Sequence, residues 1–269
     1  MRQKAFSLVE LSIVLVILGL LVGGILAGRS LIRASELRAV TTEYQRHKTS
    51  LHAFRDKYFA LPGDMPNATA FWGTASACPG DADDARTTTA TCNGDGDGQI
   101  RENASSSNER FGAWHHLANA GLVEGNFTGV SGSSISPASQ WAIVGTNVPA
   151  SKLANAGWTL GYKGNINVND TNWIDGAYSN FLLIGGQASA GNSAAARIFL
   201  PEEAWNIDKK IDDSEPGRGK FVVLESQTEC YLLSNGNSGS ISGLYTRQDI
   251  QYDLTQTEKA CVGIFRNIF

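Results

Sequence analysis

The sequence predicts an α+β protein in which a long N-terminal helix packs against an antiparallel β-sheet. Three observations support this fold class. Residues 6–58 contain no proline and are rich in helix-forming residues. Short apolar runs typical of strands follow between residues 141 and 265. These runs succeed one another mainly without intervening helices, which is typical of antiparallel rather than alternating βαβ arrangements.

The N-terminal half of the predicted helix is apolar enough to cross a membrane. A short basic segment with Arg2 and Lys4 precedes residues 6–27, a run of 22 residues in which Glu10 is the only ionisable side chain. About 20 apolar residues span a bilayer, and basic residues before the span keep that end cytoplasmic. We therefore expect a membrane-spanning segment over 6–28, with the following residues on the periplasmic side.

A cleaved secretory signal peptide, ending near Ala27, is the alternative interpretation of this segment. Glu10 argues against it, because a carboxylate inside an apolar span costs about 2.5 kcal/mol or more and marks a functional partner. A signal peptide that is removed has no use for such a residue. Glu10 therefore favours a segment that stays on the mature protein.

The residues Lys4-Ala5-Phe6-Ser-Leu-Val-Glu10-Leu, followed by the apolar run, resemble the signature of type IV prepilins. The resemblance implies that prepilin peptidase cuts between Ala5 and Phe6 and methylates the new amino terminus. It also implies that Glu10 pairs with the terminal amine of a neighbouring subunit during assembly. The family usually has Gly at the position of Ala5, and alanine is a small residue as well.

This resemblance implies a structural subunit of a type IV pilus-like filament and no enzymatic activity. The precursor would sit in the inner membrane with its head in the periplasm. An inner-membrane assembly platform would then move it from the lipid bilayer into a homopolymer, either periplasmic or extracellular. The pseudopilins of type II secretion carry the same signature, so that alternative stays open. A membrane-anchored calcium-binding or adhesive module is the third possibility.

Beyond the membrane segment, the helix is predicted to continue to Tyr58. No Pro or Gly occurs between Arg29 and Tyr58, and apolar residues recur at steps of three, four and seven, which indicates one amphipathic stripe. The stripe consists of Leu37, Val40, Tyr44, Leu51, Phe54 and Tyr58. Leu61-Pro62-Gly63 then ends the helix. At 1.5 Å per residue its length would be about 80 Å.

The chain is therefore expected to comprise a leader over 1–5, the N-terminal helix over 6–60 and a globular head over 61–269. In the head, a polar stretch over 74–110 lacks hydrophobic periodicity. Short helices are predicted over 111–123 and over 201–212, the second with Pro201 in its first position. Strands are predicted at 141–144, 158–162, 181–184, 197–200, 221–224, 230–233 and 261–265.

The four cysteines are expected to form disulfides, because a periplasmic head lies in an oxidising compartment. The expected pairs are Cys78–Cys92 and Cys230–Cys261. A zinc site is the alternative, but the successive spacings of 14, 138 and 31 positions match no compact zinc module.

Charge and motifs argue against a nucleic-acid binder and against an enzyme. The formal net charge is −4, and removing Arg2 and Lys4 leaves 20 basic against 26 acidic side chains, or −6. Affinity for phosphates depends on Lys and Arg, so we expect no nucleic-acid partner. The chain contains no His-Glu-x-x-His, Gly-x-Ser-x-Gly or Cys-x-x-Cys motif. His115 and His116 are adjacent on a predicted helix and point in different directions, which favours core or surface roles.

The polar stretch contains a candidate calcium site that begins at Asn93. The run Asn93-Gly-Asp95-Gly-Asp97-Gly-Gln99 matches the opening of an EF-hand-like loop, with oxygen ligands at positions one, three and five and Gly at position six. Such alternation places several oxygens around one point, as a hard cation requires.

The twelfth position of this loop departs from the pattern, because Ala104 replaces the usual bidentate Glu. The missing ligand would come from Glu102, Glu109 or the group Asp81, Asp83 and Asp84. Seven acids and two Arg between Cys78 and Glu109 give a local charge of −5, which would repel itself without a cation. A solvated acidic loop is the alternative to a Ca²⁺ site.

Overall fold

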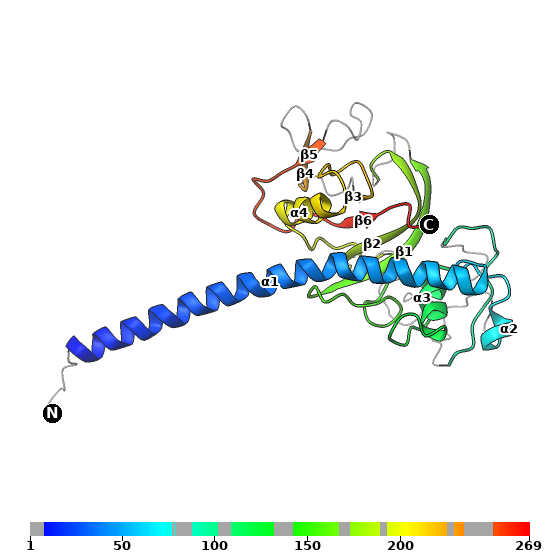
Figure 1. Ribbon diagram of the computed structural model, residues 1–269, viewed down its shortest axis with the longest axis horizontal. Coiled ribbons are helices and arrows are strands. Elements are labelled where there is room, and N and C mark those ends of the chain that lie inside the picture. Colours follow the sequence, from blue (N-terminus) through cyan, green and yellow to red (C-terminus); the bar gives the residue numbers. More distant parts are fainter. Residues whose placement is uncertain are drawn as a thin grey trace.

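The computed structural model describes residues 8–76, 78, 88–101, 109–131, 142–166, 173–188, 193–224, 229–233 and 250–269. Its dominant element is α1 (Leu8–Tyr58), a single helix of 51 residues. The first half of α1 projects from the molecule, and the second half lies along the head (Figure 1). The remaining elements of the described chain all belong to the head.

The two halves of α1 have opposite surroundings. Every large hydrophobic side chain from Leu8 to Ile32 is at least half exposed. Val40, Leu51 and Phe54, by contrast, are completely buried, as the amphipathic stripe predicts. The predicted long helix is therefore confirmed from Leu8 onward, and its apolar first half finds no partner within the described part of the chain.

The head contains a four-stranded antiparallel sheet in the order β1-β2-β6-β3. The hairpin strands β1 (Ala156–Ile166) and β2 (Gly176–Gly186) are long, and Trp158 pairs with Ile184. Next to β2 lies β6 (Gly263–Phe265), which also pairs with β3 (Phe221–Val223). The predicted α+β class with an antiparallel sheet is thus confirmed.

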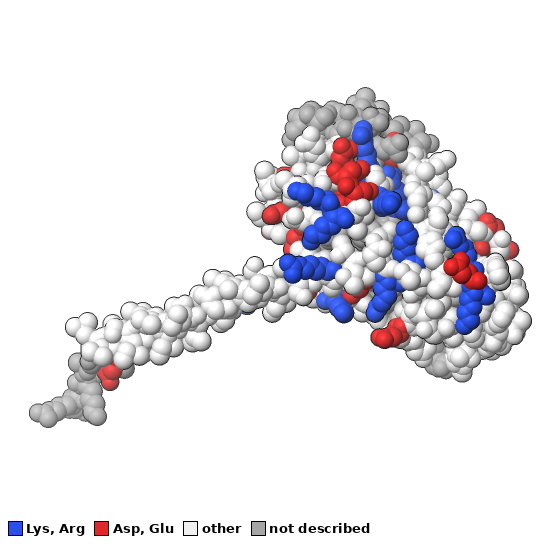
Figure 2. Space-filling view, in the orientation of Figure 1, with Lys and Arg blue, Asp and Glu red and all other residues white. Residues whose placement is uncertain are grey.

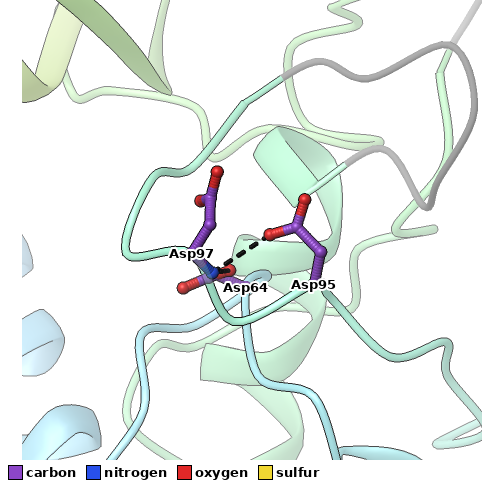
Figure 3. Close-up of side chains that lie close together, drawn as sticks. All are labelled: Asp64, Asp95 and Asp97. Atoms are coloured by element: carbon purple, nitrogen blue, oxygen red, sulfur yellow. Dashed lines mark hydrogen bonds between the residues drawn. The ribbon is translucent and has the colours of Figure 1, made fainter.

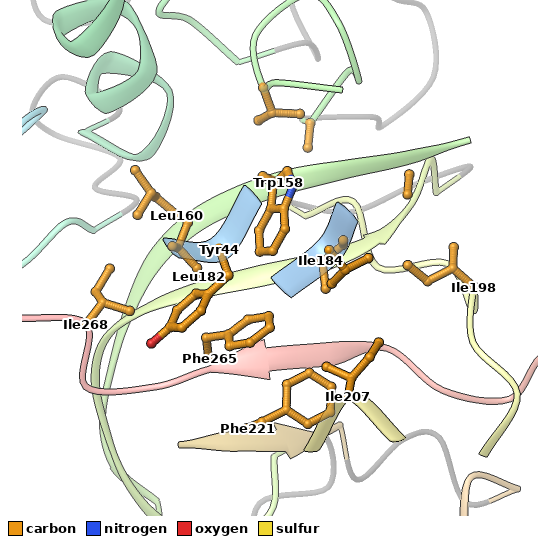
Figure 4. Close-up of a cluster of buried hydrophobic side chains, with 14 of the residues drawn as sticks. Tyr44, Trp158, Leu160, Leu182, Ile184, Ile198, Ile207, Phe221, Phe265 and Ile268 are labelled. Carbon is orange, nitrogen blue, oxygen red and sulfur yellow. The ribbon is translucent and has the colours of Figure 1, made fainter. Parts of the chain in front are cut away.

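One face of this sheet packs against α1 and holds the main core (Figure 4). Side chains alternate across a strand, so Phe265 of β6 points toward α1 while Ile264 points to the opposite face. The ring of Tyr44 stacks on Phe265, with centroids 4.1 Å apart and an interplanar angle of 16°. Each such aromatic pair is worth roughly 0.5–1.5 kcal/mol beyond the area that it buries.

Three short helices and a second sheet complete the described head. They are α2 (Thr69–Trp72), α3 (Glu109–Asn119), α4 (Pro201–Ile211), β4 (Tyr231–Leu233) and β5 (Ile250–Tyr252). The strands β4 and β5 pair only with each other, and α1 contacts both α3 and α4. The helix predicted at 201–212 is confirmed with Pro201 first, and the one predicted at 111–123 is present but runs from Glu109 to Asn119.

Two predicted strands are wrong. Residues 142–144 of the run 141–144 end in a tight turn, in which the N–H of Asn147 donates to Ile143 O at 3.1 Å, so Val144 forms only an isolated bridge. The run 197–200 is cut short because α4 begins at Pro201, and Phe199 forms a single bridge to Cys261. Two elements, α2 and β5, were not predicted.

Both expected disulfides are present, Cys78–Cys92 and Cys230–Cys261. The second disulfide joins Cys230, which directly precedes β4, to Cys261, which forms a β-bridge with Phe199. It therefore ties the small sheet to the segment that leads into the central strand β6.

A buried carboxylate fixes α1 to the sheet. Glu43 is 6% exposed and accepts hydrogen bonds from Ser151 Oγ at 2.6 Å, the Lys152 N–H at 2.8 Å and Trp158 Nε1 at 2.9 Å. These donors come from β1 and from the turn before it. Because hydrogen bonds to a charged group contribute about 1.5–3 kcal/mol, they set the position of α1 along the sheet.

A buried histidine lies one turn further along α1. The ring of His47 packs edge-on between Trp114 and Trp158, with centroids 5.1 Å and 5.3 Å away, and its Nδ1 has no hydrogen-bond partner. Burial, with a smaller contribution from Arg46, lowers the pKa of His47 to about 3. The ring is therefore neutral in the folded protein.

We expect this histidine to make the head less stable in mild acid. Below pH 6.5 the unfolded chain binds a proton at His47 that the folded chain excludes, so stability is lost as the pH falls toward 3. Between pH 7 and pH 5 the free energy of unfolding should fall by about 2 kcal/mol more in the wild type than in His47→Phe. Urea unfolding at both pH values measures this. Thr49→Val, a control at an exposed site, should lose as much unfolding free energy as the wild type. If His47→Phe also loses that amount, His47 is not the cause of the acid sensitivity.

Candidate functional site

The projecting half of α1 is the first candidate site. It is almost devoid of charged side chains (Figure 2) and is long and apolar enough to cross a membrane, with none of that stretch buried in the head. Glu10 lies in its first turn. The predicted processing residues Ala5 and Phe6 lie outside the described residues.

Small residues interrupt this apolar surface at regular intervals. A Cβ added at Gly19, Gly23, Gly24 or Gly28 would meet no atom within 4 Å. The spacing of four between Gly19 and Gly23, and between Gly24 and Gly28, places each pair on one side of the helix. Such pairs allow another helix to approach the backbone closely.

The second candidate site is the predicted calcium loop, which folds around Asp64. The Asp64 side chain is only 3% exposed. Its Oδ1 accepts the N–H groups of Gly96 at 2.7 Å and Asp97 at 3.0 Å, and its Oδ2 accepts that of Gly98 at 3.0 Å. Successive backbone N–H groups that converge in this way form an anion-binding nest. The nest is filled by a carboxylate from the segment after α1.

A second buried carboxylate closes the ends of the same loop. Glu109, in the first turn of α3, accepts the N–H of Asp95 at 3.2 Å and that of Arg101 at 3.0 Å. Asn180 of β2 adds two further bonds, from Ile100 N–H at 2.8 Å and to Gly98 O at 2.9 Å. The loop is therefore held against α3 and β2.

These two carboxyls are costly to ionise. Burial raises the pKa of Asp64 to about 6 and that of Glu109 to about 7, and the backbone N–H donors act in the opposite direction. Negative charge on Asp95 raises both pKa values further. The Asp97 carboxylate pairs with Arg101, so the loop leaves Asp64, Asp95 and Glu109 to be compensated by a proton or a cation.

The structure brings together part of the predicted calcium ligand set. Carboxylate oxygens of Asp64, Asp95 and Asp97 lie within 4.8 Å of one another (Figure 3). Asp64 was not predicted as a ligand, because it reaches this loop from about 30 positions earlier in the chain. Its only signal in the sequence was the Pro- and Gly-rich segment that follows α1.

The other predicted ligands are placed differently. Asn93 Oδ1 accepts the N–H of Thr69 at 2.9 Å, at the start of α2. The N–H of Gln99 donates to Asp97 Oδ1 at 2.9 Å, which completes a turn within the loop. Glu102 and the group Asp81, Asp83 and Asp84 lie outside the described residues.

The adjacent histidines of α3 have structural roles. His116 Nδ1 accepts the Gly63 N–H at 3.0 Å, so Nε2 carries the proton and faces Thr91 Oγ1 at 2.9 Å. His115 Nδ1 lies 2.6 Å from Phe127 O and donates to it. Both side chains are 1% exposed, so of the core and surface roles that the sequence left open, the structure shows the core one.

Calcium binding at Asp95 and Asp97 stays a prediction that stoichiometry can test. Replacing both residues with Asn should remove one equivalent of bound Ca²⁺ from the full-length protein in detergent, because it removes two carboxylates from one point. Equilibrium dialysis followed by elemental analysis measures the change. If the amount of bound Ca²⁺ per protein does not change, this segment is a solvated acidic loop and not a calcium site.

The comparisons with known proteins concern the N-terminal segment. Residues 1–26 match the family model described as the prokaryotic N-terminal methylation motif. No curated protein and no solved structure matches the chain. The chain therefore carries, in front of a mixed α+β head, the N-terminal signature of type IV pilins and pseudopilins.

Proposed function

We propose that this chain is the precursor of a structural subunit that polymerises through α1 into a type IV pilus-like filament. In this proposal prepilin peptidase cleaves between Ala5 and Phe6, and the apolar half of α1 stays on the mature subunit. The observation that carries the proposal is the unburied apolar half of α1. The methylation motif over residues 1–26 supports it.

The exposed side chains of α1 need a partner outside the subunit. Sixteen large hydrophobic residues between Leu8 and Ile32 are at least half exposed, and burying one such side chain completely is worth about 1.5–3 kcal/mol. A bilayer covers them in the precursor. In a filament, the same surfaces of neighbouring subunits cover one another, and the two glycine pairs allow close helix contacts.

Glu10 would stabilise one axial register between neighbouring α1 helices over the others. A carboxylate within an apolar environment requires a counter-charge, and cleavage before Phe6 creates a positively charged amine. Pairing between Glu10 of one subunit and this amine of the next would set the axial register between them. Apolar packing alone distinguishes poorly between registers, because it is not directional.

The head would follow the helix as one unit. Near the point where α1 leaves the head, Arg33 donates two hydrogen bonds of 2.6 Å to Glu203 of α4 and one of 2.9 Å to Ile198 O. This planar, bidentate pair has the strong geometry of Arg–carboxylate contacts. The orientation of the head relative to the projecting helix is therefore restrained at its base.

A pseudopilin of a type II secretion machine is the second candidate, because it shares the same motif. The two differ in where the filament is found. A pilus subunit would be recovered in sheared surface material, whereas a pseudopilin would stay in the periplasm and support secretion of other proteins.

The processing step gives the first prediction of the proposal. The mature chain should begin at Phe6, carry a methyl group on its amino terminus and retain the whole apolar segment. Mass spectrometry of the N-terminal peptide measures this. A mature terminus near Arg29 would instead show a cleaved secretory protein and remove the filament proposal.

The role of Glu10 gives a second prediction. Glu10→Val should insert into the membrane at least as well as the wild type, because the desolvation cost disappears. Filament yield should nevertheless fall strongly, because the partner amine loses its counter-charge. Electron microscopy and quantification of sheared material measure the yield.

The matched control for this experiment is Ser12→Val, which removes a polar group from the same apolar segment without changing its charge. Within the described residues the Ser12 hydroxyl bonds inside the helix, to Val9 O at 2.9 Å, so its replacement should preserve assembly. Wild-type amounts of filament from Glu10→Val would show that the acid has no part in assembly.

A further inference from the structure

Three carboxylates meet at the C-terminal end of α4, far in sequence from the predicted calcium loop. Asp208 and Asp212 are one helical turn apart and so share a face of the helix. Asp213 follows where the chain leaves α4. One carboxylate oxygen from each of the three lies within 4.8 Å of the others.

The innermost of these carboxylates lacks a partner at one oxygen. Asp208 is completely buried. Its Oδ2 accepts a hydrogen bond of 2.9 Å from the hydroxyl of Tyr252 in β5, but its Oδ1, also buried, has no hydrogen-bond partner. A buried carboxyl oxygen without a partner is unfavourable, which points to a proton or a cation at this position.

No basic side chain supplies that partner in the part of the chain that the structure describes. The ion pairs of the head involve other acids, and none of them reaches Asp208, Asp212 or Asp213. Three acids gathered without a cationic side chain repel one another. Among the described residues, then, no side chain neutralises the three acids, and a proton or a metal ion from solution would do so.

The loop after α4 holds the two outer carboxylates in place. The N–H of Lys220 donates to Asp212 Oδ2, and that of Glu215 donates to Asp213 Oδ1 at 2.9 Å. Gly219 has a positive φ of 68°, and a Cβ there would collide with the carboxylates of both Asp212 and Asp213. The backbone of this loop is thus shaped to accommodate the two acids, both of which remain open to solvent.

We propose that Asp208, Asp212 and Asp213 bind a divalent cation of the hard, oxygen-preferring class, namely Ca²⁺. The exposed pair Asp212 and Asp213 would admit the ion, and the free oxygen of Asp208 would be its innermost ligand. The acidic group found here contains no His or Cys ligand, which disfavours zinc. Ca²⁺ fits better than Mg²⁺, because it tolerates irregular ligand geometry and completes its shell with water and backbone oxygens.

The ion would join elements that are separate in the sequence. Asp208 is bonded to Tyr252 of β5, so the cation would link the end of α4 to the small sheet. Through α4, which contacts α1, it would also act on the helix that carries the head. Binding would therefore stabilise the contact between the head and the helix that carries it.

The test uses the full-length protein in detergent, stripped with EDTA, and monitors its melting temperature as Ca²⁺ is added. The background is Asp95→Asn with Asp97→Asn, so that the other acidic group does not contribute. At free Ca²⁺ about 100-fold above the dissociation constant, the melting temperature should rise by roughly 5–10 °C. Adding Asp212→Asn and Asp213→Asn should abolish this rise.

A spectroscopic measurement accompanies the melts. Tb³⁺ replaces Ca²⁺ at oxygen sites, and excitation of Tyr252 beside Asp208 should produce sensitised Tb³⁺ emission. We expect this emission in the background protein, its loss on adding Asp212→Asn and Asp213→Asn, and its competition by Ca²⁺. Mg²⁺ at the same concentration should compete poorly.

The variant Asp208→Asn distinguishes between the two explanations, a bound cation and a proton shared by Asp208 and Asp212. The substitution keeps the shape and removes the charge, so the protein should fold, be at least as stable as the wild type in EDTA, and lose both responses to cations. If the background protein shows no Ca²⁺-dependent rise and no sensitised emission, Asp208 and Asp212 share a proton instead, and the proposal is overturned. Responses that survive Asp208→Asn would overturn it equally.

Discussion

The constraint on which the rest of this molecule depends is that one continuous helix lies in two different environments. The C-terminal half of α1 completes the core of the head, with Val40, Leu51 and Phe54 fully buried. The N-terminal half exposes every large hydrophobic residue that it has between Leu8 and Ile32. The described part of the head does not cover them, since that half projects away from it (Figure 1). This half of the helix needs a cover from outside the described chain, and under the proposed function a bilayer or other copies of α1 provide it.

The buried polar contacts of α1 make its two halves act together. Glu43 receives three hydrogen bonds from β1 and the preceding turn, and Arg33 holds α4 through a bidentate pair with Glu203. Polar contacts of this kind require defined geometry, whereas the aromatic stacking of Tyr44 on Phe265 supplies area. The first type fixes how the helix sits on the sheet and the second stabilises it. The head is thereby held in a fixed position relative to the projecting half, as the proposed filament would require.

Local patterns predicted much of this fold from the sequence. The helix, its buried stripe, the central parts of strands β1 and β2, and α4 with Pro201 at its start all follow from periodicity and short-range signals. Predictions failed where long-range contacts decide. Phe199 reads as part of a strand, yet only its bridge to Cys261 fits before α4 begins. Asp64 fills the nest of a loop about 30 residues away, and no local pattern indicates that contact. Likewise, the free oxygen of Asp208 becomes visible only when Tyr252 and the loop at Gly219 are placed around it.

The central claim is that the apolar half of α1 stays on the mature subunit and is covered by other copies of itself. Site-specific photocrosslinking tests this most directly, with a benzophenone amino acid at Leu18 and, as a control, at Gln45 on the exposed face of α1 within the head. In assembled material, Leu18 should give abundant adducts between two copies of this chain, and Gln45 should give few. Before assembly, adducts at Leu18 should be with lipid. Assembled material in which Leu18 gives no adduct between copies, or in which the mature chain lacks residue 18, would contradict the account.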